Sequence, residues 1–460
     1  MNKIKGHKTI LFFIFLSFFA SSITAQSGGW QSLFDGKTLK GWRSLAGTAK
    51  FSVENGEIVG TTILNSGNTF LATEKEYGDF IMEIDIKIES PDGNSGVQTR
   101  SHFDANANNG KGLVYGRQVE VDPSSRRWTG GIYDEGRRKW LYPMTLNTPA
   151  QAAFMQNFYN HFRIECIGNE MRTFVNGIPC AYLVDTLDNR GFIALQAHNV
   201  TKAGEENKKI WFRNIRIKTS GLKFTPFPKG IYVVNHVPNT LTPYERENGW
   251  KLLFDGKTSN GWIGAYKNTF PEKGWNITNG SMNVEGSVGK ESTNGGDVVT
   301  TAKYSAFDLS FEFKLTPGAN SGVKYFVTLS EGNKGSAIGL EYQVLDDALH
   351  PDAKLGRDGD RTLASVYDLI PSNKPSTSLR PIGEWNIGRI IVYPDNRVEH
   401  YLNGVKVLEY VRGSKEFRDL VGISKFKVWK DFGEAPEGRI LLQDHGNAVS
   451  FRSIKIKVLH

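Results

Sequence analysis

The sequence predicts an all-β protein that contains two tandem β-sandwich domains. The first observation behind this prediction is a repeat: WQSLFDGKTLKGW at residues 30–42 returns as WKLLFDGKTSNGW at residues 250–262. A period of nearly half the chain is far longer than that of a solenoid repeat, so it indicates a duplicated domain. The second observation is composition, since 49 glycines and 17 prolines among 460 residues are typical of a turn-rich β protein.

The third observation is the alternation of apolar and polar residues. Residues 80–88 (FIMEIDIKI) and 307–315 (FDLSFEFKL) alternate throughout, which places one face of each predicted strand on a core and the other toward solvent or a cleft. Asn-Gly dipeptides at 176–177 and 403–404 predict tight hairpin turns. Sustained helical periodicity is almost absent. We therefore expect each copy to form one β-sandwich or jelly roll.

The ends of the repeat divide the chain. Residues 1–25 combine a basic start, an apolar run and small residues before a cleavage point, which is typical of a signal peptide. The apolar run is too short to span a bilayer, so we expect an exported protein, periplasmic or extracellular, without stable membrane insertion. The first copy is expected at 27–220, a proline-containing linker at 221–248 and the second copy at 249–460.

Composition excludes several function classes. The net charge is +8, but basic and acidic residues are interspersed without a basic run, so we expect no nucleic-acid partner. The two cysteines, Cys166 and Cys180, are too few for a disulfide framework, and buried free thiols are at least as well supported as a disulfide. The absence of a nucleophile elbow, HExxH, CxxC or phosphate loop argues against serine hydrolases, zinc proteases and nucleotide-dependent enzymes.

Polar residues on one face of a predicted strand form the first candidate site. Gln118 and Glu120 share a face, while the intervening valines face the core. A carboxylate on a concave sheet can act as a general acid or base. The second copy has Glu341 and Gln343 at the equivalent positions, so the two residue types exchange places. The alternative interpretation is a solvent-exposed strand face, but the recurrence favours a site.

A Gln-x-His pair ends a later strand in both copies. The pairs are Gln196 with His198 and Gln443 with His445. Histidine titrates near neutral pH and is the commonest proton-transfer residue. The alternative is a histidine that only hydrogen-bonds a loop. The recurrence makes the two interpretations about equal.

Two further sets of residues complete the candidates. Arg100 and Lys324 follow an Asn-Ser-Gly motif and, if they point into the cleft, could polarise a ligand oxygen. A charged loop near Tyr-Asp offers sugar-holding groups in the first copy, and the second copy has His and carboxylates in its own loop at 350–361. Those residues leave a divalent metal open, without a defined ligand set, and no cofactor is assigned. The loop candidates of the two copies are Asp134, Arg137, Trp140 and Asp368.

The chain resembles the 3-keto-disaccharide hydrolase domain family over nearly the whole of both copies. The resemblance rests on LFDGKT-x-x-GW, NSGV, GLEYQVLDD, VYDLIP, LNG and LQDHG in the second copy, and on QVEVDP, GGIYDEGRRKWLYP and LQAH in the first. It implies a concanavalin A-like lectin/glucanase fold. It also implies a hydrolase that cleaves glycosides already oxidised at C3, by C2 proton abstraction, β-elimination and hydration.

The resemblance implies roles for the candidates. In the first copy Glu120 or His198 would be the base, and the groups that hold the ketone side and the sugar would be Arg100, Gln118, Asp134, Arg137, Trp140 and Gln196. In the second copy the titratable candidates would be Glu341 and His445, supported by Lys324, Gln343, Asp368 and Gln443.

Two other classes of function stay open. One or both copies could be a non-catalytic, lectin-like carbohydrate-binding module, because a fold does not determine function. The chain could also be a conventional retaining or inverting glycosidase. The expected ligand in every case is an oligosaccharide or glycoside. A functional partner that oxidises sugars at C3 follows from the family chemistry alone.

Overall fold

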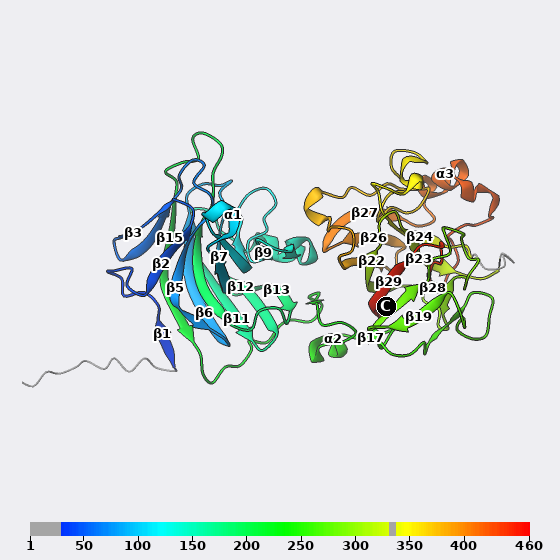
Figure 1. The fold of residues 1–460 in the computed structure, drawn as a ribbon, viewed down its shortest axis with the longest axis horizontal. Helices are drawn as coiled ribbons and strands as arrows, with labels where there is room; N and C mark the ends of the chain where they lie inside the picture. The colour runs from blue at the N-terminus through cyan, green and yellow to red at the C-terminus, as the bar shows by residue number, and fades with distance from the viewer. Residues whose placement is uncertain (1–28, 331–336) are drawn as a thin grey trace, which may run out of the picture.

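The computed structural model describes residues 29–330 and 337–460, so the expected signal peptide at residues 1–25 lies outside the described residues. The strands form two sheets in each half of the chain (Figure 1). This architecture confirms the prediction of two tandem β-sandwich domains. None of the helices in the described ranges has the length and apolar character needed to cross a membrane.

The first half contains a nine-stranded and a seven-stranded sheet, in which neighbouring strands are antiparallel except for one parallel pair. The larger sheet has the order β16-β13-β12-β11-β6-β15-β4-β3, with β1 also paired to β15, and the smaller sheet has the order β10-β9-β8-β7-β14-β5-β2. The strands are β1 (Trp30–Ser32), β2 (Trp42–Ala46), β3 (Lys50–Glu54), β4 (Glu57–Thr61), β5 (Thr69–Tyr77), β6 (Phe80–Ile88), β7 (Ser95–Asp104), β8 (Leu113–Val121), β9 (Ile132–Glu135), β10 (Lys139–Tyr142), β11 (Asn160–Ile167), β12 (Glu170–Val175), β13 (Ile178–Val184), β14 (Gly191–Ala197), β15 (Lys209–Lys218) and β16 (Val234–Asn235).

The second half contains an eight-stranded and a five-stranded sheet. The larger sheet has the order β19-β20-β29-β22-β25-β26-β27, with β17 also paired to β29, and the smaller sheet has the order β18-β21-β28-β23-β24. The strands are β17 (Trp250–Leu252), β18 (Trp262–Gly264), β19 (Trp275–Thr278), β20 (Ser281–Val284), β21 (Val298–Thr300), β22 (Phe307–Leu315), β23 (Asn320–Val327), β24 (Leu340–Leu345), β25 (Asn386–Val392), β26 (Arg397–Leu402), β27 (Val405–Val411), β28 (Arg439–Leu442) and β29 (Val449–Val458).

Helical segments are short and lie in the connections between strands. The longest is α3, which belongs to the second half and lies on the side away from the linker at 221–248 (Figure 1). The helical segments are α1 (Ala107–Gly110), α2 (Pro243–Glu247), α3 (Lys415–Ile423) and the 3₁₀ turns η1 (Met144–Leu146), η2 (Thr148–Ala152), η3 (Pro351–Lys354), η4 (Ser376–Ser378) and η5 (Lys425–Val428).

Each half has its own apolar core between its two sheets. In the first half Ile84 of β6 and Phe162 of β11 pack in one cluster with Val119 of β8, and all three are fully buried. Phe311 of β22 and Tyr342 of β24 have the same role in the second half. Because strand residues alternate between faces, the neighbours of Val119 and Tyr342 point away from these cores. The faces that remain outside the cores therefore carry the polar residues of β8 and β24.

The repeated LFDGKT segment is a scaffold in both halves. The Asp35 carboxylate accepts the backbone N–H groups of residues 37 and 38, each at 2.7 Å, and Asp255 makes the equivalent turn. The Trp42 indole N–H donates to the carbonyl of Leu33 at 2.8 Å, and Trp262 repeats this contact. The duplicated motif therefore closes a turn and fixes a core indole. Cys166 and Cys180 are free and buried.

The segment at 221–248 contacts both halves. Its strand β16 adds to β13 of the first half, and the Tyr232 hydroxyl lies 2.8 Å from the Ser310 hydroxyl of the second half. Its helix α2 begins with a capping box in which Thr242 and Glu245 satisfy each other's backbone N–H groups. Glu245 also forms a buried ion pair with Lys455 of β29. The ion pair ties the linker to the second half.

We expect Lys455→Met to lower the free energy of unfolding of the second half by about 3–5 kcal/mol, because it leaves the Glu245 carboxylate buried without its cation. The control is Lys415→Met, which removes the exposed ion pair to Asp419 and should change stability little. Urea unfolding followed by tryptophan fluorescence measures both. Equal effects of the two substitutions would contradict the anchoring role of Lys455.

Candidate active site

The two halves place a pocket at the same point of the fold. In each half the pocket lies on the face of the smaller sheet that points away from the core, which is its floor. In the first half side chains of β8, β9, β10 and β14 line it, with β7 between β8 and β14 in the sheet, and in the second half the lining comes from β23, β24 and the residues that follow β28. Gln98 pairs with Gln118 in the first half, and Lys324 pairs with Glu341 in the second. The strand registers thus make Gln118 equivalent to Glu341, and Glu120 equivalent to Gln343.

The Asn-Ser-Gly motif organises both floors. Ser95 donates to the backbone carbonyl of Gln196 at 2.7 Å, and Ser321 donates to that of Gln443 at 2.8 Å, so each serine joins two floor strands. The glycine is required because a Cβ at Gly96 or Gly322 would collide with the side chain of Gln118 or Glu341, respectively. The motif therefore lets one polar side chain lie flat across the neighbouring strand.

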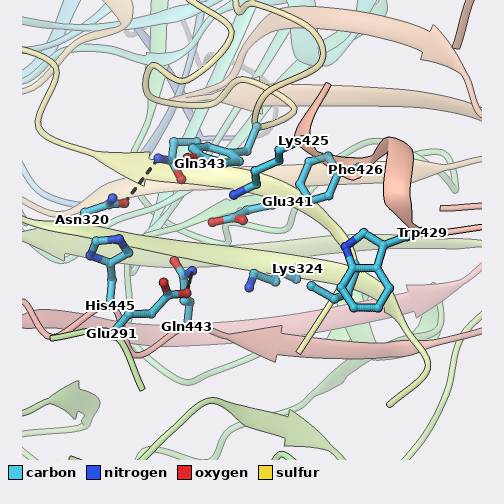
Figure 2. Close-up of a pocket in the computed structure, with 13 residues that line it drawn as sticks. Glu291, Asn320, Lys324, Glu341, Gln343, Lys425, Phe426, Trp429, Gln443 and His445 are labelled. Atoms are coloured by element: carbon cyan, nitrogen blue, oxygen red, sulfur yellow. Dashed lines mark hydrogen bonds between the residues drawn. The ribbon is translucent and has the colours of Figure 1, made fainter. Parts of the chain in front are cut away.

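The pocket of the second half is strongly charged. Figure 2 shows the Glu341 carboxylate between the ammonium groups of Lys324 and Lys425, with Trp429 and His445 at opposite ends of the pocket. Burial raises the pKa of Glu341 to about 7, although Lys324 and Lys425 act to lower it. A carboxyl group with this pKa is both ionised and basic near neutral pH, which suits proton transfer.

Two further carboxylates, Asp297 and Glu291, lie near Lys324 and favour its charged form. Asp297 is fully buried; burial raises its pKa to about 6, and it accepts the backbone N–H of Asp444 at 2.9 Å. Burial lowers the pKa of Lys324, but the carboxylates of Glu341, Asp297 and Glu291 outweigh this effect and raise it overall. Lys324 also donates to the carbonyl of Ala337 at 3.0 Å. Lys324 is therefore held as an ammonium ion at the floor.

Lys425 comes from η5, above the sheet, and Asp368 positions it. The backbone N–H of Lys425 donates to the Asp368 carboxylate at 2.7 Å, and its ammonium group lies 4.1 Å from the centre of the Tyr367 ring. Arg361 holds the other oxygen of Asp368. Asp368 is predicted from the sequence to bind substrate, but both of its carboxylate oxygens are bound by protein groups. Its role in the structure is to position Lys425.

The opposite end of the pocket has polar atoms that lack partners. Gln443 donates to Glu291 at 3.3 Å, and Gln343 lies within 3.3 Å of Asn320. Among the described residues, the side-chain amide oxygen of Gln443 and Nδ1 of His445 have no hydrogen-bond partner, and both atoms are buried. Buried polar atoms are normally paired, so these two atoms are available to a ligand or water. The structure therefore brings His445 and Gln443 to the same pocket as Glu341.

The pocket of the first half is built from amides around one carboxyl group. Gln118 donates to Glu120 at 2.8 Å and also lies 3.3 Å from the Gln196 oxygen, while Asn94 donates to Glu120 at 3.1 Å. Gln98 donates to Gln118 at 2.8 Å. Burial raises the pKa of Glu120 to about 8, partly offset by its hydrogen bonds to Gln118 and Asn94. Glu120 is thus mostly protonated at neutral pH.

His198 and Trp140 also line this first pocket. His198 Nδ1 lies 2.7 Å from the carbonyl of Asn199, and burial lowers the pKa of the ring. Trp140 packs edge-on against Trp128 at 4.5 Å between ring centres and is 6% exposed. Arg126 also lies 5.5 Å from the centre of the Trp140 ring, so this nearly buried ring supplies a wall rather than an open stacking platform.

Three predicted residues of the first half lie away from the pocket. A bulge in β7 gives Arg100 a φ of +48° and directs its guanidinium to Asp79 at 2.9 Å and to the carbonyls of Gly78 and Gly168. Asp134 is fully buried and paired with Arg137 at 2.7 Å. Arg137 is also bound to Asp188. The predicted contacts of Arg100, Asp134 and Arg137 with a sugar are therefore corrected to structural ion pairs.

Several pocket residues were not predicted. Lys425 and Trp429 lie in residues 412–438, a connection that corresponds to the short turn 185–190 of the first half, so comparing the copies gives no signal for them. Glu291 and Asp297 lie outside the repeated motifs. Within the described ranges, no group of three or more His, Cys, Asp or Glu side chains is placed to hold a metal ion.

We predict that Glu120 makes the first half less stable as pH rises. Its pKa is 4.5 in a free side chain and about 8 in the fold, so between these values the folded state binds more protons than the unfolded state and the free energy of unfolding falls with pH. Relative to Glu120→Gln, wild type should lose up to about 4 kcal/mol between about pH 5 and pH 8. Urea unfolding at several pH values measures this difference, and parallel curves for the two proteins would refute the assignment.

Comparison with known proteins places the chain in a family. Over 233 residues the chain is 40% identical to a 3-keto-disaccharide hydrolase of Bacteroides thetaiotaomicron, an alignment that covers 46% of this chain and 79% of that protein. Two crystal structures of candidate glycosyl hydrolases from Parabacteroides distasonis share 30% and 27% identity, cover 48% and 46% of this chain and all of their own, and give TM-scores of 0.43 and 0.36. Residues 29–218 and 249–457 each match the 3-keto-alpha-glucoside-1,2-lyase-like domain. The chain therefore belongs to this family, of which it contains two copies.

Proposed function

We propose that the second pocket cleaves the glycosidic bond of glycosides that carry a ketone at C3, by elimination followed by hydration. The main support for this proposal is the Glu341 carboxyl group, which is buried between two lysine ammonium groups and has a pKa of about 7. A ketone makes the neighbouring C2 hydrogen acidic, so this chemistry needs one base and a cation at the ketone oxygen. It does not need two carboxylates at a set separation.

Glu341 is the base in this mechanism. Its carboxylate takes the C2 proton, and the electron pair moves toward the C3 carbonyl, whose oxygen gains negative charge. Lys324 and Lys425 lie beside Glu341 and stabilise that oxygen. Lys324 is buried, and a fixed buried cation stabilises developing charge more strongly than water does, because it needs no reorganisation; Lys425 approaches from the exposed side of the pocket. Asp368 contributes by holding Lys425.

The second part of the reaction releases the leaving group. As the C1–C2 double bond forms, the C1–O bond breaks and the departing oxygen takes a proton. His445 is the group we assign to this proton, because its ring lies at the end of the pocket away from Trp429 and its Nδ1 has no partner among the described residues. Water then adds a hydroxyl at C1 and a proton at C2. The net change is hydrolysis, and the C3 ketone is retained.

The proposal also implies a partner and a location. Because the ketone is neither made nor consumed in this reaction, another enzyme must oxidise the sugar at C3 by two electrons. A sugar 3-oxidoreductase is the class that supplies this substrate. The basic and apolar residues at 1–25 support export, which would place the hydrolase in the periplasm or outside the cell.

Matched glucosides with and without the C3 ketone test this proposal. We expect turnover of the 3-keto glucoside only, and a loss of about 10²-fold or more in kcat for Glu341→Gln, because the amide cannot accept the proton. Glu120→Gln is the matched control in the first half and should leave kcat near wild type. Thermal unfolding of both variants checks that the fold is intact.

Two outcomes would overturn the assignment. Turnover of the plain glucoside would indicate a conventional glycosidase. A loss of activity in Glu120→Gln, with Glu341→Gln unaffected, would move the chemistry to the first pocket.

A further inference from the structure

We propose that the first pocket is a binding groove for an unoxidised, uncharged oligosaccharide chain and does not cleave it. This inference does not rest on the chemistry of the second pocket, because it is drawn from the other half of the chain. The floors of the two pockets differ at equivalent positions.

The ionic floor of the second pocket is replaced throughout in the first. Gln98 occupies the position of Lys324. Leu71 of β5 pairs with Leu195 of β14 in the first half, and Val298 of β21 pairs with Leu442 of β28 in the second. Because these pairs are equivalent, the preceding residues Phe70 and Asp297 occupy the same position. Phe70 packs in an apolar cluster with Leu45 and Val114. Each lost charge therefore has a neutral replacement, and the floor can no longer stabilise an anionic intermediate.

The lysine and arginine side chains that line the first pocket are exposed. Among the described residues that line it, the basic side chains other than His198 are Arg126 and Lys139. Arg126 is half exposed, paired with Asp122 at 2.8 Å and stacked 5.0 Å from the Trp128 ring. Lys139 is exposed. The connection that carries Lys425 in the second half is reduced here to residues 185–190.

The remaining floor suits sugar hydroxyl groups. Amides both donate and accept hydrogen bonds, as hydroxyl groups do. Nε2 of Gln196 is buried and has no partner among the described residues, so it is a donor that a ligand hydroxyl can satisfy. Glu120 and Glu135 contribute carboxyl groups to the same pocket. Among the described residues that line this pocket no lysine or arginine is buried, so nothing on the floor compensates the desolvation of a uronate or other anionic sugar, which is why we infer a neutral chain.

The groove extends beyond one sugar. A second hollow of about 540 Å³ adjoins the first pocket and shares Asn68, Glu135 and His198 with it. The neighbouring wall comes from the other half of the chain, since Thr377 of η4 lines the first pocket. Two joined hollows on one sheet face fit several linked sugars better than a single monosaccharide.

The test uses the full chain carrying Glu341→Gln, which keeps the second pocket from turning over ligand. An array of neutral tetrasaccharides and of tetrasaccharides containing a uronate selects the probe, and calorimetry then measures its affinity. We expect binding of neutral probes only. Gln196→Leu should weaken it by about tenfold through loss of a buried donor, whereas the matched Gln443→Leu in the second half should leave it within about twofold.

A second variant keeps the proposal testable if Gln196→Leu fails to fold. Thr377 is exposed on its loop, so Thr377→Trp should leave the fold intact while crowding the groove and weakening binding. Failure of all neutral probes to bind would overturn the proposal. So would equal weakening by Gln443→Leu, or release of shorter sugars that stops with Glu120→Gln. None of these results depends on whether the second pocket acts on 3-keto glycosides.

Discussion

The burial of ionisable groups on one sheet face is the constraint on which the rest of the second pocket depends. A buried carboxylate is costly unless cations or hydrogen bonds compensate it. In this protein Glu341 is compensated by Lys324 from the adjacent strand and by Lys425 from the loop above. The result is a carboxyl group with a pKa of about 7, held beside two cations. Asp297, Asp368 and the Asn-Ser-Gly turn are needed because they keep this arrangement in place.

The two halves show how one fold supports different electrostatics. Both retain the serine that joins two floor strands and the glycine that leaves room for a crossing side chain. The first half has exchanged the charged residues of the floor for amides and an apolar cluster, and its carboxyl group at Glu120 is held neutral by burial. The scaffold is thus shared, while a buried lysine lies among the described lining residues of the second pocket only.

Sequence reasoning predicted the fold well because strand periodicity and the repeat are local signals. Residues 80–88 and 307–315 form β6 and β22 with the expected bounds. Alternation within a strand also predicted that Glu341 and Gln343 share a face, and the structure places Gln443 and His445, which follow β28, in the same pocket. Sequence reasoning missed Lys425 because that residue reaches the site from a loop with no counterpart in the first half. It misplaced Arg100 because nothing in the sequence marks the bulge that turns this side chain away.

Cleavage by the proposed elimination breaks the C2–H bond of the sugar. The most direct measurement is NMR of the products formed from a 3-keto glucoside in deuterated water, with the Glu341→Gln variant reporting background exchange. Elimination and hydration predict that each sugar released by the wild-type protein carries deuterium at C2, in excess of that background and from the first turnovers. Cleavage that retains the original C2 hydrogen would rule out elimination.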